Sequence, residues 1–383
     1  MRRAAALLIL VLMFGFLPQK GTAAQLEVGG KSSLLMDVTT GTILHESNAH
    51  EPLAPASVTK VMTMLLIMEA IDSGRIRWDD TVSASEAAAA KGGSQVYLKV
   101  GETMAVTDML KSIAVSSAND CACAMAEHIA GSEAAFVELM NSRAKELGMN
   151  DTHFVNCTGL DDSEDAKNHR TSAHDIALMS RQLLHHHPEI KKFTTIWMDS
   201  VRNGAFGLSN TNKLIRFYDG ATGLKTGFTS GAGYCLSASA ARDGMELIAV
   251  VMGAENSQVR FNACKTMLDH GFANYALLQP DLTEAASVPV KLGKSALVNP
   301  RLGEQASLLI DKNQKNTVTT QIQLEESLTA PVVQGQRLGT MTITNGEQIL
   351  KEIPLVAAEG VERLTFTDLF LVILRQAAMA KPA

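Results

Sequence analysis

The sequence APASVTK at residues 54–60 runs directly into the apolar stretch VMTMLLIM at residues 61–68. Pro55 suits the first position of a helix, because its missing N–H would have no partner there and its φ is already helical. Ser57 then falls in the first turn and Lys60 one turn later. Since residues three apart share a helix face, the spacing predicts that the Lys60 amine reaches the Ser57 hydroxyl.

The helix that follows this turn has almost no polar face. Residues 61–68 therefore predict a helix enclosed on all sides. Burial would desolvate Lys60 and lower the pKa of its amine, so that a neutral amine could accept the Ser57 proton during attack on a carbonyl. The helix N-terminus would also favour developing negative charge.

A Ser-x-x-Lys spacing alone is a weak signal, because the chain contains a second example, Ser142 to Lys145. That example lies in the charged stretch 141–146, which is typical of an exposed helix face. We therefore expect Ser57, and not Ser142, to be the reactive serine, and we look for support elsewhere in the chain.

Composition excludes several classes of protein. With 383 residues, 46% hydrophobic content and a net charge of −6, the chain is typical of a globular protein of two domains and offers no basic patch for nucleic acid. Its five cysteines are an odd number and show neither a Cys-x-x-Cys pair nor a metal-ligand spacing with histidine. We expect no disulfide framework, no metal and no cofactor.

The N-terminus has the pattern of a secretory signal peptide. Basic residues at 2–3 precede an apolar run at 4–17, and the small residues at 22–24 resemble a cleavage site. A membrane anchor is the alternative, but the run is short for a span. The prediction is a signal peptide over residues 1–24 and a mature chain that begins at Gln25.

Two further segments carry polar residues at places where chemistry is possible. Residues 106–130 are predicted to be helical except at 116–120, where Ser117-Ala118-Asn119 is typical of a turn between helices. Helix capping is the simpler interpretation of this turn.

The third segment is Lys225-Thr226-Gly227, which lies beside the strongly β-like stretches 234–241 and 246–252. This neighbourhood predicts that the three residues lie on a strand. Gly227 would let a ligand approach the backbone, and the Lys225 amine with the Thr226 hydroxyl could bind a carboxylate.

The hydrophobic pattern divides the remainder of the chain into segments. A hairpin is predicted at residues 32–46, and a helix at about 259–275 closes the first domain. Beyond Pro280, short alternating segments separated by Gly and Asn predict a small all-β domain. The tail, residues 361–383, carries an apolar run too short to span a bilayer, and we expect a helix lying in the membrane surface. Packing of this helix against the β domain is the alternative.

Ser57-Val58-Thr59-Lys60, Ser117-Ala118-Asn119 and Lys225-Thr226-Gly227, in this order, resemble the motifs of the penicillin-binding protein and serine β-lactamase superfamily. Within it the chain is most similar to the low-molecular-mass D-alanyl-D-alanine carboxypeptidases, serine peptidase family S11. The stretches 152–160 and 169–175 also look like segments of that family. Cys157 departs from its pattern, which more often has proline there, without a catalytic consequence that we can identify.

The resemblance implies an α+β fold: a β-lactamase/transpeptidase-like catalytic domain, with an antiparallel sheet flanked by helices, over residues 25–276. A small β sandwich over 277–360 and an amphipathic tail over 361–383 would follow. It also implies a carboxypeptidase that removes the terminal D-alanine from peptidoglycan stem peptides through an acyl-enzyme, and that is acylated by penicillins. The enzyme would be exported and peripherally anchored to the outer face of the cytoplasmic membrane.

The same resemblance implies a role for each motif residue. Ser57 is the nucleophile with Lys60 as its base, Ser117 relays a proton to the leaving amine, and Asn119 holds the substrate amide. The substrate carboxylate would be bound at Lys225, Thr226 and Gly227, and the oxyanion hole would be the backbone N–H groups of Ser57 and Phe228. A serine β-lactamase and a catalytically silent wall-binding or penicillin-binding protein are the alternatives.

Overall fold

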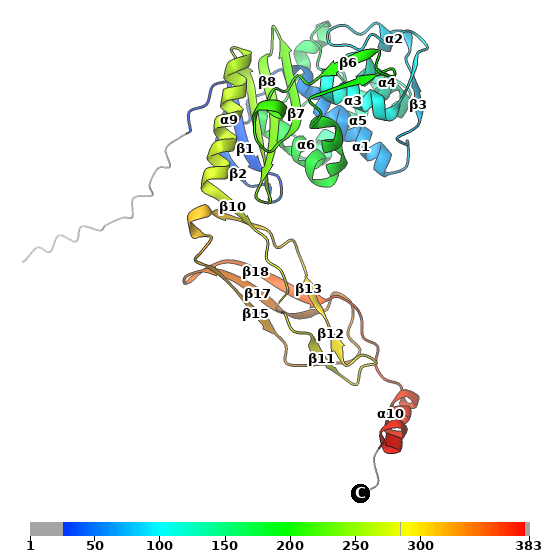
Figure 1. The fold of residues 1–383 in the computed structure, drawn as a ribbon, viewed down its shortest axis with the longest axis vertical. Helices are drawn as coiled ribbons and strands as arrows, with labels where there is room; N and C mark the ends of the chain where they lie inside the picture. The colour runs from blue at the N-terminus through cyan, green and yellow to red at the C-terminus, as the bar shows by residue number, and fades with distance from the viewer. Residues whose placement is uncertain (1–25, 284, 380–383) are drawn as a thin grey trace, which may run out of the picture.

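The structure, a computed structural model, describes residues 26–283 and 285–379. Figure 1 shows an elongated molecule with an α+β part at one end, an all-β part in the middle and a single helix, α10, at the other end. The predicted signal peptide and the start at Gln25 lie outside the described residues.

A five-stranded antiparallel sheet forms the centre of the α+β part, in the order β2-β1-β9-β8-β7. Strand β7 therefore lies at one edge. The strands are β1 (Ser32–Asp37), β2 (Ile43–Ser47), β7 (Ala221–Thr229), β8 (Gly233–Arg242) and β9 (Met245–Ala254).

Helices cover both faces of this sheet (Figure 1). Strand β9 is apolar at nearly every position because its side chains alternate between two buried cores. One core, under helix α9 (Ser257–Asn274), takes Leu247, Ala249 and Val251; the other, under the larger group of helices, takes Ile248, Val250 and Met252. The helices of that larger group are α1 (Lys60–Asp72), α3 (Val106–Ser116), α4 (Asn119–Ala130), α5 (Glu133–Glu146) and α6 (Ala173–His186).

Shorter elements complete the α+β part. They are η1 (Ala56–Thr59), β3 (Thr81–Ser83), α2 (Glu86–Ala89), β4 (Thr103–Ala105), η2 (Glu164–Asn168), η3 (Pro188–Ile190), α7 (Lys191–Thr194), β5 (Met198–Val201), β6 (Phe206–Ser209) and α8 (Leu214–Phe217).

The all-β part begins where α9 ends, at β10 (Tyr275–Leu278), which pairs with β14 (Leu308–Asp311). Its two main sheets have the orders β12-β11-β16 and β13-β18-β17-β15. One small apolar core takes side chains from both sheets, and a second lies on the four-stranded sheet. The strands and helices are β11 (Val288–Lys291), β12 (Leu297–Val298), β13 (Pro300–Leu302), η4 (Lys312–Gln314), β15 (Val318–Leu324), β16 (Leu328–Thr329), β17 (Arg337–Asn345), β18 (Gln348–Ala357) and α10 (Phe366–Met379).

The predicted α+β class, with its antiparallel sheet and following β part, is confirmed. The predicted tail, however, begins inside the all-β part. Val361 is buried and bridges Val332, and the Leu364 N–H donates to the Leu292 carbonyl. Helix α10 itself starts only at Phe366, after a cap in which the Thr365 and Asp368 side chains each accept from the other's backbone N–H.

Candidate active site

Ser57 and Lys60 lie at the junction of η1 and α1. The Lys60 Nζ donates to Ser57 Oγ at 2.8 Å, as the three-residue spacing predicts, and to the Thr158 carbonyl at 2.9 Å. Pro55 precedes the turn as its N-cap, one position earlier than expected. The turn is a 3-10 helix, which is tighter than the predicted α-helical turn.

The Lys60 amine is enclosed by protein. Its side chain has no exposed surface, and every residue from 61 to 68 is buried, as the apolar run predicts. Burial lowers the pKa of Lys60 to about 7, while the smaller effects of Cys157 and Asp120 act in the opposite direction. Near neutral pH a large fraction of Lys60 is therefore an uncharged amine that can accept a proton.

The second motif forms the turn between α3 and α4. Ser117 adopts a left-handed conformation, with φ of 65°, and Asn119 begins α4. The Asn119 Nδ2 donates to the Gly92 carbonyl at 2.7 Å, whereas its buried Oδ1 has no hydrogen-bond partner among the described residues. The amide oxygen of Asn119 is thus a buried acceptor without a donor in the described structure. Within residues 26–283 and 285–379, Ser117 Oγ shows no hydrogen bond to Ser57 or Lys60.

The third motif lies on edge strand β7, beside the serine turn. A Cβ atom at Gly227 would lie 2.6 Å from the Pro55 carbonyl oxygen and 3.1 Å from the Ser57 nitrogen. Only glycine lets the strand approach Ser57 so closely. The sequence interpretation was that Gly227 lets a ligand approach the backbone, and that stays a prediction; the group that approaches Gly227 in the structure is the serine turn.

Lys225 and Thr226 are neighbours on strand β7. Lys225 is buried, and its Nζ donates to the Thr226 carbonyl at 2.8 Å. Burial, together with the positive charges of Lys60 and Arg260, shifts the pKa of Lys225 well below its ordinary value. A ligand carboxylate would relieve this crowding of positive charge. The Thr226 hydroxyl donates to Thr211 Oγ1 at 2.7 Å.

Two functional groups were missed by the sequence reasoning. Arg260, on α9, is buried and donates to the carbonyls of Gly227 and Cys235 at 2.8 and 3.2 Å, so it supports β7 from the opposite layer. An arginine among the apolar residues of a helix was an available signal. No signal in the sequence pointed to the Thr158 carbonyl, because every residue has a backbone carbonyl.

The sequence matches two known protein families. Residues 19–256 match the family described as D-alanyl-D-alanine carboxypeptidase, and residues 274–363 match the C-terminal domain of penicillin-binding protein 5. The chain belongs to the D-alanyl-D-alanine carboxypeptidase family. It is a serine-type D-Ala-D-Ala carboxypeptidase, and this assignment selects the carboxypeptidase over the β-lactamase and the silent binding protein considered above.

Relatives of this carboxypeptidase match over nearly its whole length. It is 42% identical to the D-alanyl-D-alanine carboxypeptidase DacF of Bacillus subtilis, over 95% of this chain and 96% of the relative. The structure resembles penicillin binding protein 5 of Haemophilus influenzae, with a TM-score of 0.72, 30% identity and coverage of 88% and 98% of the two chains. It also resembles penicillin-binding protein D2 of Listeria monocytogenes in its ampicillin-bound form, with a TM-score of 0.59, 32% identity and coverage of 64% and 99%.

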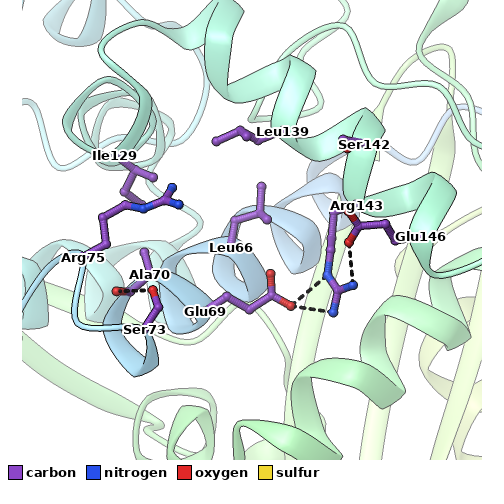
Figure 2. Close-up of a pocket in the computed structure, with 10 residues that line it drawn as sticks. All are labelled: Leu66, Glu69, Ala70, Ser73, Arg75, Ile129, Leu139, Ser142, Arg143 and Glu146. Carbon is purple, nitrogen blue, oxygen red and sulfur yellow. Dashed lines mark hydrogen bonds and ion pairs between the residues drawn. The ribbon is translucent and has the colours of Figure 1, made fainter.

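The second Ser-x-x-Lys of the carboxypeptidase lies elsewhere. Ser142 lines a pocket of about 300 Å³ between the C-terminal half of α1 and helix α5 (Figure 2). The cation beside it is Arg143, which is held by Glu69 and Glu146 at 2.9 Å each. Ser142 and Lys145 are both exposed, so the burial that lowers the pKa of Lys60 is missing at this site.

Proposed function

We propose that Ser57 is the nucleophile of this carboxypeptidase and that Lys60 is its general base. The observation that carries the proposal is the 2.8 Å contact between Lys60 Nζ and Ser57 Oγ, made by an amine without exposed surface. Neutral Lys60 takes the hydroxyl proton while Ser57 Oγ bonds to the carbonyl carbon of the penultimate D-alanine. The backbone N–H groups of Ser57 and Phe228 bind the oxyanion that forms.

The tetrahedral intermediate then breaks its C–N bond. Ser117 relays a proton to the leaving amine, free D-alanine departs, and an ester with Ser57 remains. Water hydrolyses that ester and returns the proton to the Lys60–Ser57 pair. In the described structure the buried Asn119 Oδ1 has no hydrogen-bond partner, which supports the role of Asn119 in holding the substrate amide.

We propose that the stem peptide ending in D-Ala-D-Ala binds along edge strand β7. An edge strand offers backbone groups to an extended peptide, and β7 lies against the Ser57 turn at Gly227. The terminal carboxylate is received by Lys225 and Thr226. Penicillins, which mimic the same terminus, acylate Ser57.

Replacing Lys225 by alanine is expected to slow hydrolysis of peptides with a free C-terminal carboxylate by about 10²-fold, the effect of losing roughly 2–3 kcal/mol of a charge-assisted contact. The melting temperature should change little, because the lost bond to the Thr226 carbonyl is offset by removing an amine that is unfavourably buried near Lys60 and Arg260. D-alanine release from a diacyl-Lys-D-Ala-D-Ala peptide measures the effect. Lys213→Ala, at an exposed lysine, is the control.

A C-terminal amide analogue sharpens this test. Wild-type enzyme should strongly prefer the free carboxylate, and Lys225→Ala should lose that preference. Equal loss on both peptides would instead assign Lys225 to the support of β7.

We propose that α10 holds the enzyme at the outer face of the cytoplasmic membrane. In the described part of the chain, no helix combines the length and the apolar character needed to cross a bilayer. Several large apolar side chains of α10 are nevertheless exposed: Phe366, Leu369, Phe370, Leu371 and Leu374. Such a helix is suited to lie in the headgroup region. The division into segments 1–24, 25–276, 277–360 and 361–383 also remains a proposal, with residues 361–364 packed as part of the all-β region.

Truncation after Leu364 is expected to release an active enzyme from washed membranes. The cut falls there because Val361 is part of the core of the all-β region and Leu364 is bonded to Leu292. Membrane fractionation and D-alanine release are the measurements. The control keeps the full length but replaces Phe366 and Phe370 by aspartate, and it should be released as well. A truncated, folded enzyme that stays with the membrane would contradict the role of α10.

A further inference from the structure

The residue before the nucleophile has an unusual backbone conformation. Ala56 is buried and has φ of +48°, in the left-handed region that side chains other than glycine rarely adopt. Such a conformation persists only where the surroundings hold it, and it concentrates at functional sites. The groups that hold Ala56 therefore bear on the geometry of Ser57.

A chain of two buried side chains holds the Ala56 carbonyl. Thr59 Oγ1 donates to that carbonyl at 2.8 Å, and Thr59 Oγ1 also lies 2.8 Å from His169 Nε2. The other ring nitrogen, Nδ1, accepts the Val155 backbone N–H at 3.2 Å. Because Nδ1 accepts, the ring proton is on Nε2 and is donated to Thr59, which leaves the Thr59 proton for Ala56.

His169 is fixed in this role by its surroundings. Its side chain is buried and lies edge-on to the Phe154 ring, with 5.6 Å between centroids. Burial lowers the pKa of His169 to about 4, helped by the charges of His153, Arg170 and Lys60. The ring is therefore neutral at physiological pH and keeps one donor and one acceptor.

The peptide unit that links Ala56 to Ser57 transmits this constraint. A peptide unit is planar and trans, so its C=O and N–H point in opposite directions. When Thr59 binds the Ala56 oxygen, the Ser57 N–H is aimed away from Thr59. That N–H is one of the two donors assigned to the oxyanion hole.

Gly159 packs closely against the same turn and also restricts the position of the Ala56 carbonyl. A Cβ atom at Gly159 would lie 1.8 Å from the Ala56 oxygen and 2.7 Å from Thr59 Oγ1. Gly159 follows Thr158, whose carbonyl binds Lys60, and comes four residues after Val155, which binds His169. One loop thus contacts the base, the serine turn and the histidine.

We propose that His169 is a positioning residue that acts through Thr59 to aim the Ser57 N–H into the oxyanion hole. This inference rests on the proposed role of Ser57. It adds a residue that contacts neither substrate nor nucleophile, and it predicts a defect that appears when the oxyanion forms and not when the ligand binds.

The test compares four variants of the whole protein. Thr59→Val and His169→Leu each remove one link of the hydrogen-bond series from His169 through Thr59 to the Ala56 carbonyl. Thr59→Ser keeps the hydroxyl, and His169→Gln keeps an N–H that can replace Nε2–H. Loss of one oxyanion donor costs about 10²–10³-fold in rate, so a misdirected donor should slow acylation by a fluorescent penicillin about 10–100-fold. The dissociation constant of the complex before acylation should not change.

An infrared measurement reports on the oxyanion hole directly. The ester carbonyl stretch of the penicillin acyl-enzyme should move to higher frequency in Thr59→Val and His169→Leu, because the Ser57 N–H bond to that carbonyl weakens. Thr194→Val is the matched control. It removes another buried threonine that donates to a backbone carbonyl, that of Thr222 at 2.6 Å, without touching Ala56.

The expected result is slow acylation and a shifted carbonyl stretch in both Thr59→Val and His169→Leu. The acylation rate should recover in Thr59→Ser and recover in part in His169→Gln. The double variant Thr59→Val/His169→Leu should be no slower than either single one. If the single effects multiply, or if only the dissociation constant changes, the proposal is wrong. Should Thr59→Val fail to fold, His169→Leu against His169→Gln decides the question alone. Labelling that persists in Ser57→Ala would instead overturn the proposed function.

Discussion

Ser57→Ala is expected to abolish labelling by a fluorescent penicillin and D-alanine release, with a loss on the order of 10⁶-fold when a catalytic serine is removed. The reason is that Ser57 supplies the hydroxyl that accepts the acyl group, and its Oγ lies 2.8 Å from the buried Lys60 amine. Gel labelling and a D-alanine assay measure the two losses. The melting temperature should stay near that of the wild type, because Ser57 is only partly buried and the turn keeps its backbone contacts.

Ser142→Ala is the matched control for this experiment. It belongs to the same Ser-x-x-Lys spacing but sits in the pocket between α1 and α5, beside the Arg143 ion pairs (Figure 2). Labelling and hydrolysis should remain at the wild-type level. Labelling that disappears with Ser142 and survives without Ser57 would reverse the assignment.

Lys60→Ala is expected to slow acylation by at least about 10²–10⁴-fold, the usual contribution of a general base. The variant also leaves the Thr158 carbonyl without its Lys60 donor. Stopped-flow acylation by a chromogenic cephalosporin measures the loss. Lys145→Ala, the exposed lysine of the second Ser-x-x-Lys, should acylate at the wild-type rate.

The pH profile provides a separate test of Lys60. The active form is the neutral amine, and the pKa of Lys60 is lowered to about 7. Acylation should therefore be nearly independent of pH above 8 and should fall by about tenfold per pH unit below 6 as the amine takes up a proton. A rate that is flat between pH 5 and 9 would contradict a basic role for Lys60.

The parts of the site that could be predicted depend on residues that are close together in the sequence. Ser57 and Lys60 share a helix face, Ser117 and Asn119 occupy a turn that their polarity marks, and Gly227 lies on a strand between β-like segments. The α+β fold was predicted from the family resemblance, and the structure shows a matching local feature, because β9 is apolar on both faces and is covered by two layers.

The parts that could not be predicted depend on contacts between distant segments. The Thr158 carbonyl meets Lys60 across 98 positions of sequence, and His169 meets Thr59 across 110. A carbonyl is present in every residue, and a buried neutral histidine has no pattern of its own. Arg260 was visible as an arginine within α9, but its target, the Gly227 carbonyl, depends on how β7 and α9 pack.

The contacts of residues 361–364 could not be predicted for a related reason. Residues 361–364 join the all-β region through one bridge, one core side chain and one backbone bond to Leu292. None of these contacts leaves a periodic signal in so short a stretch. The cap formed by Thr365 and Asp368 was the available signal for the start of α10.

The most direct test of the account is to locate the acyl group itself. Wild-type enzyme is mixed with penicillin, and in parallel with a diacyl-Lys-D-Ala-D-Ala peptide under rapid quench, and then digested for mass spectrometry. We predict that both reagents add their acyl mass to the fragment that contains Ser57, and that the fragment with Ser142 stays unmodified. An acyl group on any other residue, or peptide hydrolysis without an adduct on Ser57, would contradict the account.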